Sequence, residues 1–431
     1  MQTKLQTIAR KAKENRNYQF FGLYTMLNED FLLETWHMLN KRAACGVDKI
    51  SYQDYNANVK ANVKDLVERL KRKAYRAKLV KRHYIPKANG KLRPLGIPAT
   101  EDKLLQLAVS RILTAIYEED FHDCMYGYRP GKSPRMVLDD IQNALQFGKY
   151  KYIVEADIKG YFENLDHDWL IKMLKIRIKD EPMIRLIRKW LKAGVLKTDG
   201  KIINPLTGTP QGGIISPLLA NLYMHYVIVS WFNVAARKQC IGKARLFVYA
   251  DDFIGIFENR NEAEAFYRAL PGRLKKFNLE VAVEKTKIIK FDKIDKGGSG
   301  TFDFLGFTFR HVKSRNGYDF VKRVTIKKRF QASLQGLKEW CKENRSTPLK
   351  YLMSILISKM RGYINYYGLP GNDRMYKFVH LARIIIHKWL NRRSQRKSYT
   401  WETFTQMLEI YGFPQPRMIV RKRDTQLLLP I

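Results

Sequence analysis

Cysteine is scarce in this sequence, with four residues among 431. Cys45, Cys124, Cys240 and Cys341 lie far apart in the chain and form no Cys-x-x-Cys pair. A disulfide framework and a zinc site are therefore both unexpected, and a reducing compartment such as the cytoplasm fits this usage. The polar and basic stretch 1–15 also lacks the apolar core of a secretory signal.

Acidic side chains are the second deficit, because 41 Asp and Glu stand against 79 Lys and Arg. The net charge is +38 and the isoelectric point is about 10. An excess of this size destabilises a compact chain by self-repulsion unless a polyanion neutralises it. The composition thus indicates a nucleic-acid partner, with an anionic membrane surface as the competing interpretation.

A long unbroken apolar run is also missing. The stretch 202–236 carries no charged residue, but Pro205, Pro210 and Pro217 interrupt it, and its apolar half contains Asn221. We interpret this stretch as a loop followed by a buried helix. No membrane-spanning segment is therefore expected.

The residues that are present suffice for two or three packed subdomains, since 45% are hydrophobic and 12% are aromatic. The range 55–73 has apolar residues at helical spacing, whereas 152–157, 244–248 and 253–257 are short apolar runs typical of buried strands. The last 121 residues hold 25 Lys and Arg against 7 Asp and Glu. We therefore predict a mixed fold with a domain boundary near 311–325.

Two adjacent acids, Asp251 and Asp252, stand at the tip of a hairpin between two apolar strands. Aspartate favours turns, so a plain turn is the more common explanation for an isolated pair. Asp157 changes this balance because it ends another apolar strand, which can lie beside the hairpin. Converging carboxylates repel one another unless a cation neutralises them. They are typical ligands for two Mg²⁺ ions, or Mn²⁺, that activate a hydroxyl and stabilise a leaving pyrophosphate.

Three motifs occur in an order that resembles one enzyme family. Tyr249–Asp252 (YADD) resembles the YxDD box of reverse transcriptases, and Ala156–Phe162 (ADIKGYF) resembles their first catalytic motif. Thr209–Pro217 (TPQGGIISP), followed by Leu218–Asn221 (LLAN), is similar to the PQG motif in its group II intron form. By these motifs the chain is identified as a member of the group II intron-encoded reverse transcriptases and maturases.

The resemblance implies an α+β right-hand polymerase fold with fingers, a palm whose antiparallel sheet carries YADD, and a helical thumb. Asp157, Asp251 and Asp252 match the catalytic metal ligands of the family. The implied divisions are a mostly helical N-terminal extension at 1–80, fingers at 81–150, a palm at 151–310, a basic thumb or maturase domain at 311–400 and a tail at 401–431.

The family's binding site for the incoming deoxynucleotide has counterparts here. Tyr84–Lys87 and Gly90–Pro98 resemble its fingers hairpin, whose cations hold the triphosphate. One aromatic residue falls at the steric gate against a 2′-hydroxyl, although core packing is the alternative for such a ring. One lysine matches a position that protonates pyrophosphate, with a plain surface charge as its alternative. The resulting set is Lys87, Arg93, Phe162, Gln211 and Lys285.

Further segments resemble family positions that contact RNA or primer. Tyr126–Gly131 (YGYRPG) resembles the family's YGFRPG segment, with Tyr128 where Phe is usual. Its arginine either positions the template or the fingers, or is a buried structural residue. Phe304–Phe307 resembles the primer-grip turn, and Met360–Gly368 resembles the maturase thumb signature. A basic cluster follows at 389–398, for which a solvated helix face is the alternative. The expected binding set is Arg129, Gly306, Arg361, Arg392, Arg393, Arg396 and Lys397.

The resemblance runs from about residue 20 to 417. It implies a reverse transcriptase that binds a structured intron RNA, assists splicing, and copies RNA into cDNA from a DNA primer and dNTPs. Many relatives carry an endonuclease after the thumb, whereas this sequence has no cysteine pair or His-Asn-His cluster there, so we expect no cutting of the second target strand. Two alternatives fit the same motifs. One is an anti-phage defence reverse transcriptase that copies a companion noncoding RNA, and the other is a maturase that only binds RNA.

Overall fold

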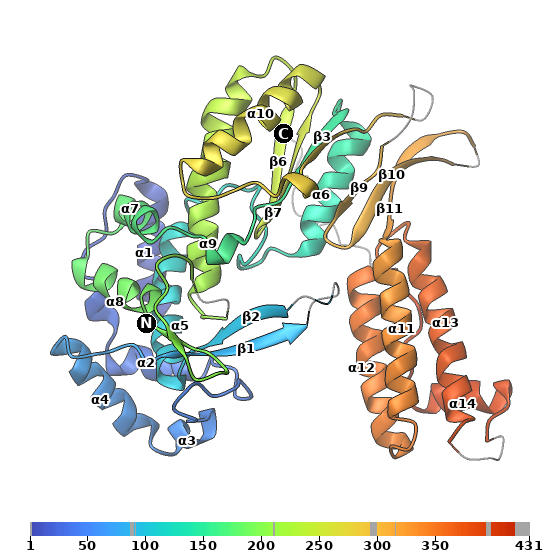
Figure 1. Cartoon of the computed structure of the whole chain (residues 1–431), viewed down its shortest axis with the longest axis horizontal. Helices are drawn as coiled ribbons and strands as arrows, with labels where there is room; N and C mark the ends of the chain where they lie inside the picture. The colour runs from blue at the N-terminus through green and yellow to red at the C-terminus, as the bar shows by residue number, and fades with distance from the viewer. Residues whose placement is uncertain are drawn as a thin grey trace, which may run out of the picture. The chain divides into compact units, whose positions relative to one another are not determined.

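The computed structural model describes residues 2–86, 90, 92–209, 212–293, 300–314, 316–393 and 398–418. In these residues the chain is a mixed structure of helices and mainly antiparallel sheets (Figure 1). It divides into two compact units. Unit 1 comprises residues 1–137 and 149–288, and unit 2 comprises residues 138–148 and 289–431.

Unit 1 contains a sheet with the strand order β6-β7-β3-β8, in which β6, β7 and β3 pair in antiparallel fashion and the edge strand β8 begins in this unit. The three predicted strands are confirmed, and their apolar runs are explained by burial: Ile153 of β3 and Ile254 of β7 are fully enclosed. Helix α10 packs on β3 and β7 (Figure 1). The bounds are Tyr152–Ala156 for β3, Ala244–Tyr249 for β6, Asp252–Phe257 for β7, Lys287–Lys290 for β8 and Arg260–Lys275 for α10.

A long apolar helix lies in the core of unit 1. It begins as α9 (Ser216–Met224) and passes through two π-helical segments, His225–Val229 and Phe232–Ala236. Its length and hydropathy over 216–239 would allow a membrane span, but 67% of the apolar window is buried inside the protein. Core helices of this kind pass the same test, and the burial agrees with the predicted loop and buried helix.

A second sheet in unit 1 contains the predicted hairpin. Strands β1 (Val80–Pro86) and β2 (Leu92–Ile97) pair in antiparallel fashion, with Ile85 opposite Arg93. Strand β4 (Val195–Leu196) adds to β1 in parallel, and β5 (Ile202–Ile203) completes the order β2-β1-β4-β5. The sheet is thus wider than the hairpin that the sequence indicates.

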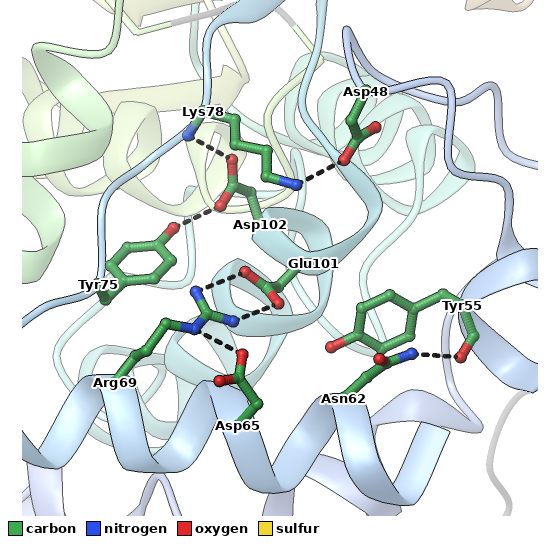
Figure 2. Close-up of polar contacts among 9 residues, drawn as sticks. All are labelled: Asp48, Tyr55, Asn62, Asp65, Arg69, Tyr75, Lys78, Glu101 and Asp102. Atoms are coloured by element: carbon green, nitrogen blue, oxygen red, sulfur yellow. Dashed lines mark hydrogen bonds and ion pairs between the residues drawn. The ribbon is translucent and has the colours of Figure 1, made fainter. Parts of the chain in front are cut away.

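Helices of the N-terminal part pack on one another. The single helix predicted over 55–73 is two helices, α3 (Tyr52–Ala57) and α4 (Val59–Lys71), because Asn58 has the non-helical angles φ −128° and ψ 36°. Arg69 of α4 donates two hydrogen bonds, of 2.7 and 3.1 Å, to the carboxylate of Glu101 on α5 (Thr100–Tyr117) (Figure 2).

The neighbouring carboxylate of Asp102 is buried in the same network (Figure 2). It accepts hydrogen bonds from the Tyr75 hydroxyl at 2.5 Å and from the backbone N–H of Lys78 at 3.0 Å. Burial raises the pKa of Asp102 to about 6, although these two hydrogen bonds act against the rise. This part of unit 1 therefore holds a carboxyl group that titrates near neutral pH.

One buried arginine fastens the N-terminal helix. Arg177 is 1% exposed and donates hydrogen bonds to the backbone carbonyl groups of Ala12, Asn15 and Arg16, some 160 residues earlier. Its guanidinium also pairs with Asp120 at 3.3 Å. Arg177 thus joins α7 (His167–Arg177) to α1 (Gln2–Glu14). Nearby, α2 (Glu29–Trp36) packs on α5, and α8 (Glu181–Leu191) packs on α7.

Unit 2 combines an antiparallel sheet, in the order β11-β10-β9, with a helical bundle (Figure 1). Helix α6, which comes much earlier in the chain, is fixed to this sheet: Gln142 donates to the carbonyl of Val321 at 2.9 Å, and Arg323 pairs with Asp139 at 2.5 Å. The bounds are Pro134–Phe147 for α6, Phe302–Phe304 for β9, Phe307–Lys313 for β10, Asp319–Thr325 for β11, Lys327–Glu343 for α11, Leu349–Tyr367 for α12, Asp373–Leu390 for α13 and Trp401–Ile410 for α14.

The division between the units falls after residue 288, upstream of the boundary expected near 311–325. The reason is that β9 to β11 are packed with the bundle. The ring of Phe307 lies 5.4 Å from that of Tyr367 on α12, and Asn372 donates to the hydroxyl of Thr325 at 2.9 Å.

Candidate active site

The strand register brings the three predicted aspartates to one end of the sheet. Tyr249 pairs with Asp252 across β6 and β7, so Ala250 and Asp251 form a two-residue turn, with Ala250 in the left-handed region at φ +58°. On the other side of β7, Ala156 pairs with Phe253. The next residue of the β3 chain, Asp157, therefore leaves the sheet beside the hairpin tip.

Burial and neighbouring charges shift the pKa values of groups in this cluster. Burial raises the pKa of Asp251, and the negative charge of Asp157 raises it further. The Lys285 ammonium forms an ion pair with Asp157, and this hydrogen bond raises the pKa of Lys285. A positive group thus already lies on one of the carboxylates that the sequence predicts as metal ligands.

Within the part of the chain that the structure describes, no three His, Cys, Asp or Glu side chains are gathered as a ready metal site. This finding still fits Mg²⁺, which is commonly held by one or two carboxylates together with water and substrate phosphates. Hard carboxylate oxygens of Asp157 and Asp251, close enough to raise a pKa, suit such an ion. The donor set therefore fits divalent metal.

The back of the hairpin is covered by the segment Tyr126–Gly131. The N–H of Tyr126 donates to the carbonyl of Val248 at 2.9 Å. Gly127 lies so close to the turn that an added Cβ would be 2.3 Å from the backbone nitrogen of Ala250. Only glycine allows this approach. The segment Tyr126–Gly131 therefore supports the turn that carries Asp251.

Asn221 of α9 connects a third motif to this support. Its side chain is 2% exposed, and its Nδ2 donates to the carbonyl of Gly127 at 2.7 Å. The Leu-Leu-Ala-Asn helix thereby holds the residue on which Ala250 rests. Three motifs that are separate in sequence form one continuous contact chain behind the aspartates.

The loop around Thr209–Pro217 is held from several sides, although Pro210 and Gln211 lie outside the described residues. The N–H of Thr209 donates to the carbonyl of Phe162 at 2.8 Å. Gly212, at φ +113°, is so near β2 that a Cβ would stand 2.5 Å from the carbonyl oxygen of Gly96. The N–H of Ile214 donates to the buried Gln106 side chain at 3.0 Å.

Of the predicted nucleotide-binding residues, three lie around the aspartates. Lys285 contacts Asp157, Phe162 is partly buried beside Tyr161, and the positive charge of Arg93 on β2 acts to lower the pKa of Asp251. The structure therefore places a cation of the β1–β2 hairpin within electrostatic reach of the turn that carries Asp251. Lys87 and Gln211 lie outside the described residues.

Arg129 is held inside unit 1. Its side chain is 6% exposed, it pairs with Glu118 at 3.0 Å, and it donates to the carbonyl groups of His122 and Met125 at 2.8 and 3.0 Å. These contacts favour the structural role that the sequence left open over direct contact with template.

The remaining RNA- or primer-binding candidates belong to unit 2. Gly306, at φ +87°, forms the turn between β9 and β10, and Arg361 is exposed on α12. Arg392 is exposed, with its guanidinium 5.5 Å from the centre of the Trp389 ring, whereas Arg393 donates to the carbonyl of Thr347 at 2.7 Å. Arg396 and Lys397 are not among the described residues.

The sequence motifs missed several supporting residues. Gln106 carries no motif signal at all, because its partner Ile214 is 108 positions away. Gly127 and Asn221 do stand inside recognised motifs, but nothing in the sequence shows that they touch each other. His167, whose Nε2 is 2.7 Å from the carbonyl oxygen of Gly208, was likewise unforeseen.

Comparison with known proteins agrees with this arrangement. The family reverse transcriptase (RNA-dependent DNA polymerase) matches residues 85–309, just over half of the chain. Group II intron-encoded protein LtrA of Lactococcus lactis subsp. cremoris is 40% identical over 223 residues, 51% of this chain and 37% of that protein. Protein YkfC of Escherichia coli (strain K12) is 31% identical over 305 residues, 63% of this chain and 77% of that protein.

An uncharacterized 91 kDa protein in cob intron of Schizosaccharomyces pombe is 34% identical over 220 residues, 50% of this chain and 27% of that protein. The chain thus spans little more than a third of the Lactococcus protein but about three quarters of YkfC. The chain belongs to the reverse transcriptase family, among the reverse transcriptases and maturases encoded by group II introns.

Proposed function

We propose that this chain is an RNA-dependent DNA polymerase that extends a DNA primer on an RNA template. In this proposal the sheet β6-β7-β3-β8 is the palm, the hairpin β1–β2 is part of the fingers and α11–α13 form the thumb. The observation that carries this proposal is the convergence of Asp157 with Asp251, which the strand register indicates and which the effect of the Asp157 charge on the pKa of Asp251 supports. Asp252, opposite Tyr249, is the third member.

Asp157, Asp251 and Asp252 are the residues that would hold two Mg²⁺ ions. When bound, such ions activate the primer 3′-hydroxyl and stabilise the charge that develops on the leaving pyrophosphate. The carboxylates must be ionised to serve as ligands, and because burial raises the pKa of Asp251, this ligand is lost at a higher pH on acidification than an ordinary aspartate would be. Lys285, which pairs with Asp157, is also positioned to hold a proton near the triphosphate.

The nucleotide is held by residues from both sheets. Arg93, on a strand rather than a mobile side loop, supplies a fixed cation for the triphosphate. The ring of Phe162 excludes a 2′-hydroxyl by its size. The resemblance adds Lys87 at the triphosphate and Gln211 near the nascent base pair.

Primer extension on poly(rA)/oligo(dT) with dTTP and Mg²⁺ tests the polymerase proposal. The double variant Asp251→Asn/Asp252→Asn keeps the side-chain volumes but removes the negative charges, and we expect extension to fall by at least about a thousandfold. Asp168→Asn, at an exposed aspartate of α7, is the matched control and should extend like the wild type. Equal extension by the wild type and the double variant would show that this site does not polymerise DNA.

We infer further that the chain binds a structured intron RNA and assists its splicing. Two of the relatives are described by their introns, which favours this reading over the defence alternative. The basic unit 2, with exposed Arg361 and Arg392, offers a surface for phosphates. The affinity for RNA should fall by about 10³- to 10⁵-fold between about 50 and 200 mM salt if six to ten phosphates are contacted. A response flat in salt, or co-purified RNA without intron sequences, would contradict the proposal.

A further inference from the structure

Tyr128 has a backbone conformation that a bulky residue rarely adopts. Its φ is +56°, in the left-handed region, where a Cβ is crowded by its own backbone. Its side chain is 53% exposed, although Tyr126 and Arg129 on either side of it are buried. Strain of this kind persists only where the surroundings enforce it, and it gathers at functional sites.

The surroundings of Tyr128 do enforce it. Gly127 is pressed against the backbone of Ala250 and accepts the hydrogen bond of Asn221, while Arg129 is fixed by its contacts with Glu118 and with carbonyl groups. The direction of the exposed ring is therefore set by the same scaffold that supports the hairpin of Asp251.

The ring of Tyr128 faces the candidate sugar gate. It meets Phe162 edge-on, with ring centres 6.3 Å apart and planes at 83°. Phe162 also meets Tyr161, at 5.7 Å and 76°, and the Tyr161 hydroxyl donates to the carbonyl of Ala220 at 2.6 Å. Phe162 is thus in contact with two aromatic rings, each held by its own backbone or side-chain anchor.

The far end of Tyr128 lies in the field of the catalytic cluster. Burial raises the pKa of its hydroxyl, the negative charges of Asp251 and Asp252 raise it further, and Arg93 acts in the opposite direction. These influences come from the carboxylates and the cation already assigned to the nucleotide, so Tyr128 borders the same space.

We propose that Tyr128 is a specificity-determining residue. Its ring packs against Phe162 and keeps the Phe162 ring from rotating out of the position where it excludes a 2′-hydroxyl. This inference rests on the proposed polymerase function. Sugar selection by size requires an immobile ring, and Phe162 is partly exposed and needs a lateral support. Because the ring makes the contact, the Tyr128 hydroxyl is dispensable for this role.

Competition between dTTP and UTP on poly(rA)/oligo(dT) tests the proposal, since both nucleotides pair with the same template base. The measured quantity is the ratio of kcat/KM for dTTP to that for UTP. Tyr128→Ala should lower the ratio about 3- to 10-fold, the loss expected for one aromatic contact, with kcat for dTTP changed less than the ratio. Tyr128→Phe should stay within about twofold of the wild type.

Three further variants control for misfolding, for independent effects and for nonspecific changes. Tyr128→Gly relieves the backbone strain, so a lowered ratio in this variant cannot be attributed to misfolding. Tyr128→Ala should lower the ratio little further when Phe162→Ala is already present, because both changes remove the same gate. Tyr318→Ala, at a 75% exposed tyrosine in unit 2, is the control and should leave the ratio unchanged.

An unchanged ratio in Tyr128→Ala, an equal loss in Tyr128→Phe, or independent effects of Tyr128→Ala and Phe162→Ala would each overturn the proposal. A wild-type protein that incorporates neither nucleotide would instead contradict the polymerase function itself. The two failures are therefore distinguishable in the same assay.

Discussion

Replacing Asn221 by alanine removes the hydrogen bond that holds Gly127 behind the catalytic turn. Asn221 is 2% exposed and the bond is 2.7 Å long, so the Gly127 carbonyl would be left buried without this partner. Leaving a buried acceptor unsatisfied costs about 1–3 kcal/mol. If the whole of this cost is felt where Ala250 and Asp251 are positioned, kcat should fall by about 5- to 150-fold.

The assay is steady-state dTTP incorporation together with thermal unfolding. We expect KM for dTTP to stay within about twofold, because Asn221 lies behind the turn and not in the nucleotide space. Asn233→Ala is the matched control: it removes a 2.9 Å hydrogen bond to the carbonyl of Val229 further along the same helix and should cost stability without a comparable loss of kcat.

A conservative change separates positioning from general destabilisation. Asn221→Asp keeps the shape of the side chain, but only a protonated carboxyl can donate to Gly127. Burial raises the pKa of such a group, so its kcat relative to the wild type should recover as the pH is lowered from 8 to 6. If Asn221→Ala lowers the unfolding temperature but leaves kcat within about twofold, the reasoning that links α9 to the turn is refuted.

Three other predictions concern separate parts of unit 1. Gly127→Ala places a Cβ 2.3 Å from the Ala250 nitrogen and should lower kcat more than Asn221→Ala does; a smaller effect would show that the turn can retreat. Lys285→Met removes the ammonium that competes for Asp157, so the Mn²⁺ concentration for half-saturation, measured by electron paramagnetic resonance without nucleotide, should fall about 1.5- to 5-fold; weaker binding would contradict this. Asp102 has a folded-state pKa of about 6, above its ordinary 3.8, so its contribution to stability is complete below pH 3.8 and is lost as the pH rises through 6. The difference in unfolding free energy between Asp102→Asn and wild type, from urea titrations, should therefore shift in favour of the variant by about 1.4 kcal/mol from pH 5 to pH 8; a constant difference would refute the assignment.

The aspartates of the site could be predicted because they occur at the ends of apolar runs in recognisable local motifs. The strands around them follow from the same short-range pattern, since buried β-branched and aromatic runs have few other uses. Arg93 could be placed because the hairpin of β1 and β2 is local. These features depend on residues that are close in sequence.

The rest depends on contacts between distant residues. The bond from Asn221 to Gly127 spans 94 positions, and the bond from Gln142 to Val321, which assigns most of α6 to unit 2, spans 179. No periodicity or motif records such pairings. For the same reason the sequence could not decide whether Arg129 contacts RNA or is buried. In the structure its side chain pairs with Glu118 and is buried.

The anchoring of the N-terminal helix has a consequence for the order of folding during synthesis. The chain emerges N-terminus first, but the carbonyl groups at the end of α1 receive their partner only when Arg177 has been made. The backbone bridge of Phe20 to Ile178 is delayed in the same way. Until then α1, with Lys11 and Lys13 in its last turn, can pack on α5 but lacks the partner of its C-terminal carbonyl groups, and helices of this length are marginal in water without tertiary contacts. A nascent chain arrested before Arg177 should therefore leave the C-terminal end of α1 more open to protease than one arrested well beyond Arg177.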